Sequence, residues 1–125
     1  MAEKRKLDLI TARLRQSETQ ALREFVRRLQ ESLPDQIQQV ALFGSKARGE
    51  SDADSDIDLL VLINQDDRSL RREIIDIASE ISLDFDVLLS PRVISIQRWQ
   101  TRQGFALYRN IARDALPISM SSDFG

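Results

Sequence analysis

One stretch of the chain decides how the rest is interpreted: Val40 to Leu60, VALFGSKARGESDADSDIDLL. An apolar run ends at Phe43 and is followed by glycine and serine, and a second apolar run begins at Ile57. Short apolar runs that stop at glycine or at a polar cluster are typical of buried strands. The stretch therefore predicts two strands, residues 37–43 and 57–63, joined by a polar loop.

The polar loop opens on Gly44 and Ser45, directly after the first predicted strand. Glycine has no side chain to block a close approach, so the backbone amides and the serine hydroxyl of such a turn can contact phosphate oxygens. Lys46 and Arg48 add positive charge to the same turn. Each is a candidate phosphate ligand, with a solvated turn residue as the alternative.

Asp56 and Asp58 lie two residues apart at the start of the second strand. Alternate residues of a strand point to the same face, so both carboxylates leave one face while Ile57 points to the other. Two like charges this close repel each other unless solvent or a cation neutralises them. The chain has no cysteine and no histidine, so the candidate metal is a hard one held by carboxylates, Mg²⁺ or alternatively Mn²⁺.

A third strand is expected at Leu83 to Leu89, where Asp84 and Asp86 share one face. If this strand lies beside the second one, a carboxylate from it joins the first pair, and three ligands clamp two metals about 3.5–4 Å apart. Asp86 is preferred as the third ligand because it lies in the apolar centre of the predicted strand. Asp84 stays open as the alternative.

The other elements follow from apolar periods and capping signals. A helix is expected from Ser17, which forms a capping-box pattern with Gln20, to Pro34. Further helices are expected over the stripe of residues 70–81, from Ser90-Pro91 to Gly104, and over residues 105–115. We expect a helical extension at residues 1–16, the main domain at 17–118 and a flexible tail at 119–125.

Composition excludes several classes of protein. A chain of 125 residues has the size of one domain, and its net charge of −2 argues against direct nucleic-acid binding. It lacks the ~20 consecutive apolar residues of a membrane span, its start does not resemble a signal peptide, and the absence of cysteine fits a cytoplasmic protein. We expect an α/β domain whose small mixed sheet holds metals on one edge while helices cover one face.

Two widespread phosphate and metal motifs fit the same stretch less well. Residues 44–51 nearly form a P-loop, but Glu50 stands where that loop needs lysine, and a glutamate repels phosphates. The aspartates from 52 to 58 resemble the start of an EF-hand loop. However, Ile57 replaces its glycine and Ile63 its glutamate. A solvated turn remains the alternative for an isolated acid pair, and the Gly-Ser turn before this pair favours a functional site.

The spacing of these residues resembles the minimal nucleotidyltransferases of the DNA polymerase β nucleotidyltransferase superfamily. The shared signature is LFGSKARG at residues 42–49, SDIDL at residues 55–59, and an aspartate between apolar residues further on. The similarity runs from about Leu22 to Ile118. The resemblance implies a polymerase β-like fold. It also implies catalytic and metal-binding roles for Asp56, Asp58 and Asp86, and nucleotide contacts by Gly44, Ser45, Lys46, Arg48 and Ser55.

The resemblance also implies a substrate and a partner. Many members of this group are antitoxins paired with HEPN-domain toxins, and some are similar to enzymes that transfer AMP from Mg-ATP to a tyrosine of that toxin. We therefore expect a nucleotidyltransferase antitoxin that uses ATP and two Mg²⁺ ions to modify a hydroxyl of a cognate HEPN toxin. The alternatives are a small-molecule nucleotidyltransferase and an antitoxin that neutralises its partner by binding alone.

Overall fold

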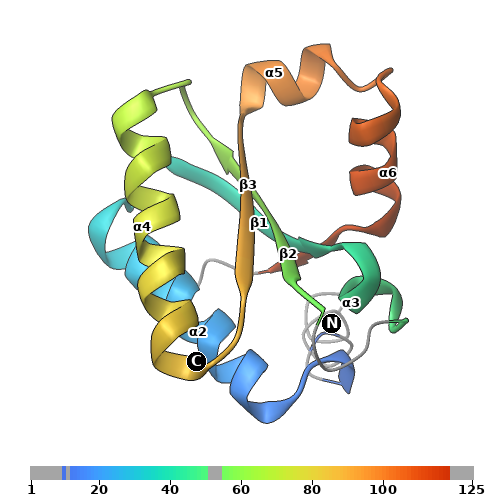
Figure 1. Ribbon diagram of the computed structural model, residues 1–125. Helices are drawn as coiled ribbons and strands as arrows, with labels where there is room; N and C mark the ends of the chain where they lie inside the picture. Colours follow the sequence, from blue (N-terminus) through green and yellow to red (C-terminus); the bar gives the residue numbers. More distant parts are fainter. Residues whose placement is uncertain (1–9, 11, 51–54, 119–125) are drawn as a thin grey trace, which may run out of the picture.

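The computed structural model describes residues 10, 12–50 and 55–118, and its centre is a four-stranded mixed sheet (Figure 1). The strand order is β3-β2-β1-β4. β2 runs antiparallel to β1 and parallel to β3, and β4 runs antiparallel to β1. The bounds are β1 Ile37–Phe43, β2 Ile57–Ile63, β3 Leu89–Ser95 and β4 Leu116–Ile118. The expected α/β class is confirmed, and β1 and β2 have the predicted bounds.

Two long helices, α2 Gln16–Ser32 and α4 Arg68–Phe85, cover one face of the sheet (Figure 1). Their apolar stripes recur every three or four residues, so each helix presents a continuous apolar face to the strands. Phe25 and Leu29 of α2 and Ile74 and Ile81 of α4 are fully buried there. No helix in the described part of the chain is long and apolar enough to span a membrane.

The start of α2 differs from the predicted capping box. Its N-cap residue is Arg15, and the Arg15 backbone N–H donates to Oε1 of Glu18 at 2.9 Å. Ile10 and Leu14 are buried in the same core as the sheet and α2. The described part of the predicted extension, residues 10 and 12–16, therefore packs against the domain. The predicted tail at 119–125 lies outside the described residues.

The other face of the sheet carries α5 Ile96–Thr101 and α6 Ala106–Asp114 (Figure 1). Tyr108 and Ile111 of α6 are buried against the strand residues of opposite parity, Ala41, Leu60, Leu62 and Ile94. Trp99 stacks on Tyr108 with ring centroids 5.5 Å apart. The expectation that helices cover only one face is therefore wrong, because both faces of these strands are apolar and both need cover.

The predicted strand from Leu83 to Leu89 is also wrong. α4 continues to Phe85, four residues after Ile81 on the same stripe, and Phe85 packs against the core. Asp86 follows in the left-handed conformation with φ 53°, and its N–H donates to the Ser82 carbonyl. Asp84 is thus an exposed residue of α4 and Asp86 is the residue that ends this helix, so neither lies on a strand.

Ser90 and Pro91, predicted to begin a helix, lie within β3. β3 is an edge strand, where a proline is tolerated although it cannot donate a ladder hydrogen bond. The next helix begins after Ser95, whose Oγ accepts a hydrogen bond from the Arg98 N–H at 3.2 Å. The strand therefore starts six residues later than predicted, at Leu89 and not at Leu83.

The left-handed conformation of Asp86 at the end of α4 predicts how substitutions there change the stability of the protein. Asp86→Gly is expected to keep the free energy of unfolding within about 1 kcal/mol of wild type, because glycine adopts a positive φ without strain. Asp86→Val should lower it by about 1–3 kcal/mol, because a β-branched side chain is strained there. Urea denaturation measures both. A strand at this position requires the reverse order, so a valine variant more stable than the glycine variant would contradict the helix end.

Candidate functional site

The turn after β1 and the start of β2 meet at one end of the sheet. Phe43, the last residue of β1, pairs with Asp58 of β2, so Gly44 comes next to that carboxylate. Gly44 has φ +77°, and a Cβ added to it would lie 2.3 Å from Asp58 Oδ2. Only glycine lets the backbone turn this close to the carboxylate. The short helix α3 Gly44–Arg48 starts from this point.

Asp58 belongs to the face of the sheet that α6 covers, because Leu60 and Leu62 share its parity and are buried on that face. The Asp58 side chain is half-buried, whereas Asp56 is exposed. Burial raises the pKa of Asp58 and the nearby Asp56 raises it further, while Arg92 and Arg48 oppose the shift. Asp58 forms no salt bridge within the described residues. The site thus holds a carboxylate pair whose negative charge is only partly compensated.

The two carboxylates fit a hard divalent cation. Their oxygens are the ligands that Mg²⁺ prefers, and Mg²⁺ usually completes its shell with water and substrate phosphates around one or two carboxylates. A divalent ion would also relieve the repulsion that raises the pKa of Asp58. Across residues 10, 12–50 and 55–118, no three acidic side chains converge on a common point. Asp86 is therefore not brought to Asp56 and Asp58.

The residues of β3 that face Asp58 are Ser90 and Arg92. The parallel register pairs Asp58 with Ser90 and Leu60 with Arg92. Ile94, which has the same parity, is buried on the α6 side of the sheet. A serine and an arginine thus occupy the part of the neighbouring strand where the sequence predicted a third carboxylate.

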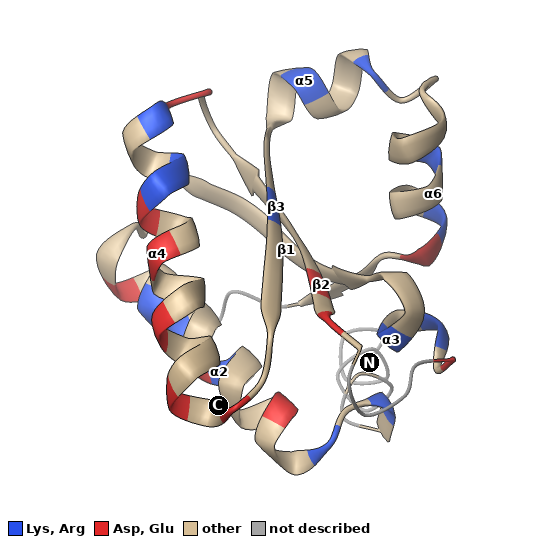
Figure 2. Cartoon of the chain, viewed as in Figure 1, with Lys and Arg blue, Asp and Glu red and all other residues tan. Residues whose placement is uncertain are grey.

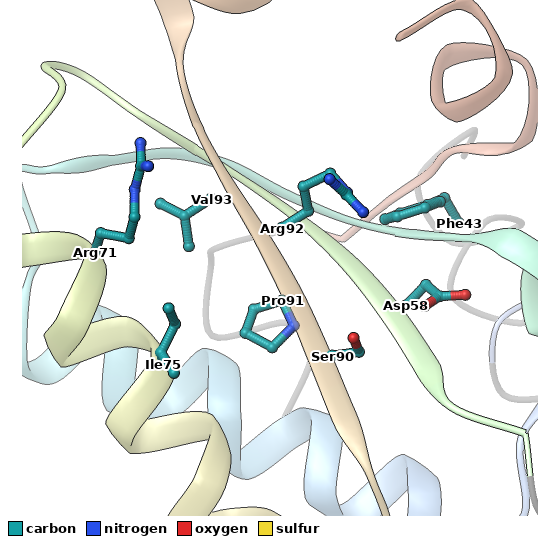
Figure 3. Close-up of a pocket in the computed structure, with 8 residues that line it drawn as sticks. All are labelled: Phe43, Asp58, Arg71, Ile75, Ser90, Pro91, Arg92 and Val93. Atoms are coloured by element: carbon teal, nitrogen blue, oxygen red, sulfur yellow. The ribbon is translucent and has the colours of Figure 1, made fainter. Parts of the chain in front are cut away.

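A cavity of about 390 Å³ wraps around the edge strand beside Asp58 (Figure 3). Figure 3 shows Arg92, Asp58 and Ser90 on the side of Phe43, and Arg71 and Ile75 of α4 on the other side. The lining residues are Phe43, Asp58, Arg71, Ile75, Ser90, Pro91, Arg92 and Val93. The sequence prediction missed the contribution of β3 because it placed this strand too early. The signals for the true position were the helical stripe that continues to Phe85 and the capping serine at Ser95.

Lys46, a predicted phosphate contact, forms a buried ion pair. Its Nζ lies 2.6 Å from Glu18 Oε2, and the two side chains are 2% and 3% exposed. Burial alone would raise the pKa of Glu18, but hydrogen bonds from Lys46 and from the Arg15 amide outweigh burial and lower it. In this structure Lys46 therefore fastens α3 to α2, and its charge is compensated inside the protein.

Arg48, the other predicted basic contact, bridges two carboxylates. Its Nε lies 3.0 Å from Glu50 Oε2 and its Nη1 lies 2.7 Å from Asp114 Oδ2, at the end of α6. Arg13 adds a third link, since its Nη1 donates to the Ala47 carbonyl at 2.6 Å. α3 is thus held by α2, by α6 and by the segment before α2. Figure 2 shows the basic end of α3 beside the acidic start of β2.

Gly44 and Ser45 lie at the start of α3, as half-buried residues next to β2, and Ser55 is half-buried just before Asp56. The structure therefore brings together Gly44, Ser45, Asp56 and Asp58, as the sequence predicted. It places Lys46 and Arg48 in protein ion pairs and leaves Asp86 at the end of α4. Nucleotide and metal binding by any of these residues remains a prediction.

The chain is similar in sequence to a known protein family and to two curated proteins. A model of the family described as "Nucleotidyltransferase domain" matches residues 22–111. Two curated candidate protein adenylyltransferases from Methanocaldococcus jannaschii are similar to the chain. One is 41% identical over 71 residues, covering 56% of this chain and 72% of its own length. The other is 29% identical over 98 residues, covering 78% and 94%.

Two solved structures share the fold. A chain of a toxin–antitoxin crystal structure with AMP-PNP matches with a TM-score of 0.53 and 19% identity, over 80% of this chain and 73% of that one. A chain of a mutant MntA–HpeT toxin–antitoxin structure matches with a TM-score of 0.51 and 19% identity, over 81% and 73%. At this level of identity the likeness shows the fold alone.

The buried pair of Lys46 and Glu18 predicts a large effect on stability. Lys46→Met is expected to lower the free energy of unfolding by about 3–5 kcal/mol, because the Glu18 carboxylate stays buried without its partner. The Glu18→Gln, Lys46→Met double variant should recover much of that loss. Chemical denaturation at neutral pH measures all three proteins. A single variant as stable as wild type would show that the pair does not anchor α3.

The same pair predicts a pH dependence. The pKa of Glu18 lies below its usual 4.5 in the folded protein. The stability it contributes is therefore complete above about pH 4.5 and is lost as the pH falls through the lowered folded value. The double variant should lose less stability than wild type as the pH falls below about 4.5. Equal losses would mean that Glu18 does not titrate as a buried, paired carboxylate.

Proposed function

We propose that this chain transfers AMP from ATP to a hydroxyl of a partner protein. The chain belongs to the nucleotidyltransferase domain family and is a nucleotidyltransferase enzyme, and the proposal starts from that fact. The observation that carries the proposal is the turn of Gly44 against Asp58, beside the exposed Asp56. It combines a glycine, which has no side chain to block the approach of a phosphate to the backbone, with a carboxylate pair that suits Mg²⁺. The names of the two archaeal relatives support a protein as the acceptor.

The reaction requires one bond to form and one to break. The acceptor oxygen bonds to the α-phosphorus of ATP, and the bond from that phosphorus to the oxygen bridging the β-phosphate breaks. Pyrophosphate leaves, and the hydroxyl proton passes to a carboxylate or to water. Asp56 and Asp58 would hold the divalent cation, which supplies positive charge to the phosphate oxygens. Gly44 and Ser45 would position the phosphates above the carboxylates.

A HEPN-domain toxin is the proposed partner, and a tyrosine hydroxyl is the proposed acceptor. The resemblance of the LFGSKARG and SDIDL segments to minimal nucleotidyltransferases supports this, and so does the fold shared with chains of toxin–antitoxin structures, one of them with AMP-PNP. Asp56 is exposed and Asp58 is half-buried at the end of the sheet. A hydroxyl on the surface of another protein therefore has access to the site without a second domain in this chain.

A binding-only antitoxin is the second candidate, and one observation favours it. The described residues do not gather a third carboxylate beside Asp56 and Asp58. A protein of this kind would neutralise its partner by covering a surface, and its carboxylates would have no part in that effect.

One set of variants decides between transfer and masking. Wild-type protein, incubated with Mg-ATP and the cognate partner, is expected to add one AMP to the partner and to release pyrophosphate. Asp56→Asn and Asp58→Asn should each slow this transfer by about 100-fold or more, because each removes a ligand charge near the reacting phosphate. Intact-mass measurement of the partner follows the reaction.

Asp84→Asn is the matched control, because Asp84 is a 64% exposed aspartate on α4. It should transfer AMP at the wild-type rate. Masking is the correct account if the partner is neutralised without any gain in mass and the Asp56→Asn, Asp58→Asn double variant neutralises it equally well.

A further inference from the structure

Arg92 lines the cavity beside Asp58, and the reaction above gives it no role. It lies on β3, on the same face of the sheet as Asp58 and two residues beyond Ser90, the register partner of Asp58. Its side chain lines the cavity and extends to the side where Phe43 and Asp58 lie (Figure 3). Arg92 is solvent-exposed, so a ligand in the cavity can reach it.

The other basic side chains near this cavity already have carboxylate partners. Arg48 is paired with Glu50 and Asp114, and Nη2 of Arg71 lies 2.8 Å from Asp66 Oδ1. Arg92, in contrast, makes no salt bridge to any residue that the structure describes. Nε of Arg71 has no hydrogen-bond partner either, but it is buried, whereas Arg92 is exposed. Among the described residues that line the cavity, Arg92 is therefore the cation that has no carboxylate partner and that a ligand can reach.

The Arg92 guanidinium and a third carboxylate at the same place would bind ligands of opposite charge. A third carboxylate would bind a second metal ion, as in two-metal sites. A fixed positive charge at the same place repels a second divalent ion instead. It also attracts phosphate oxygens, which the planar guanidinium can bind through two parallel N–H groups.

We propose that Arg92 binds the β- and γ-phosphates of the nucleotide and that the site consequently holds one divalent cation instead of two. The inference rests on the proposed function, because it takes a nucleoside triphosphate as the ligand and Asp56 and Asp58 as the metal ligands. Arg92 then neutralises charge on the leaving pyrophosphate. The cavity of about 390 Å³ around Arg92 leaves room for two phosphate groups beside β3.

Nucleotide binding tests the first half of the proposal. Arg92→Ala is expected to weaken the binding of Mg-AMP-PNP by about 10-fold or more in calorimetry, and Arg92→Lys should restore part of it by keeping the charge. Arg72→Ala is the matched control, since Arg72 is an exposed arginine of α4 that lines a different hollow. Binding by Arg92→Ala as tight as by Arg72→Ala would overturn the proposal. Arg92 is exposed and forms no salt bridge with a described residue, so its removal breaks no ion pair of the fold.

Metal counting tests the second half without any enzyme assay. Electron paramagnetic resonance of Mn²⁺ with AMP-PNP should give one bound ion per wild-type chain, and Arg92→Asp should raise the number to two. Two ions in the wild type would overturn the proposal. The proposed function is tested separately. If wild type binds AMP-PNP through Arg92 but never transfers AMP, phosphate binding by Arg92 is supported and the proposed transfer to a partner protein is wrong.

Discussion

The close approach of Gly44 to Asp58 is the constraint on which the rest of the site depends. The antiparallel pairing of β1 and β2 sets Phe43 opposite Asp58, so the chain leaving β1 must turn beside that carboxylate. The turn requires a positive φ and leaves no room for a Cβ. The ion pairs of Lys46 with Glu18 and of Arg48 with Asp114 then hold α3, which begins at Gly44, in place.

Local signals were enough to predict the centre of the fold. β1 and β2 each contain a short apolar run, residues 40–43 and 59–63, and Gly44 and Asn64 follow these runs directly. The ends of both strands could therefore be predicted from composition and from the polar residues that follow. β3 could not be read in this way. Residues 83–87 alternate aspartates with apolar side chains, a pattern that suits a strand. The helical stripe ending at Phe85 competes with it, and the helix wins because Phe85 packs against the core.

The candidate site also contains residues whose positions the local sequence predicts and residues whose contacts depend on tertiary packing. Gly44, Ser45, Asp56 and Asp58 lie close together along the chain or across one strand pair, and the structure brings them together as predicted. The partners of Lys46 and Arg48 are Glu18 and Asp114, which are distant in sequence. Arg92 becomes visible only through the register of β3 with β2. These ion pairs and this strand register depend on tertiary packing, so a local sequence pattern cannot predict them.

Substitution of Gly44 gives the most direct measurement of the central claim. Calorimetry of Mg-ATP binding should show that Gly44→Ala weakens affinity by at least about 10-fold, because the new Cβ pushes the Asp58 carboxylate away from the turn of Gly44 and Ser45. Gly104→Ala is the matched control, since a Cβ there has no neighbour within 4 Å, and it should bind as wild type does. Thermal unfolding verifies that both variants are folded. Wild-type affinity in a folded Gly44→Ala protein would contradict the account.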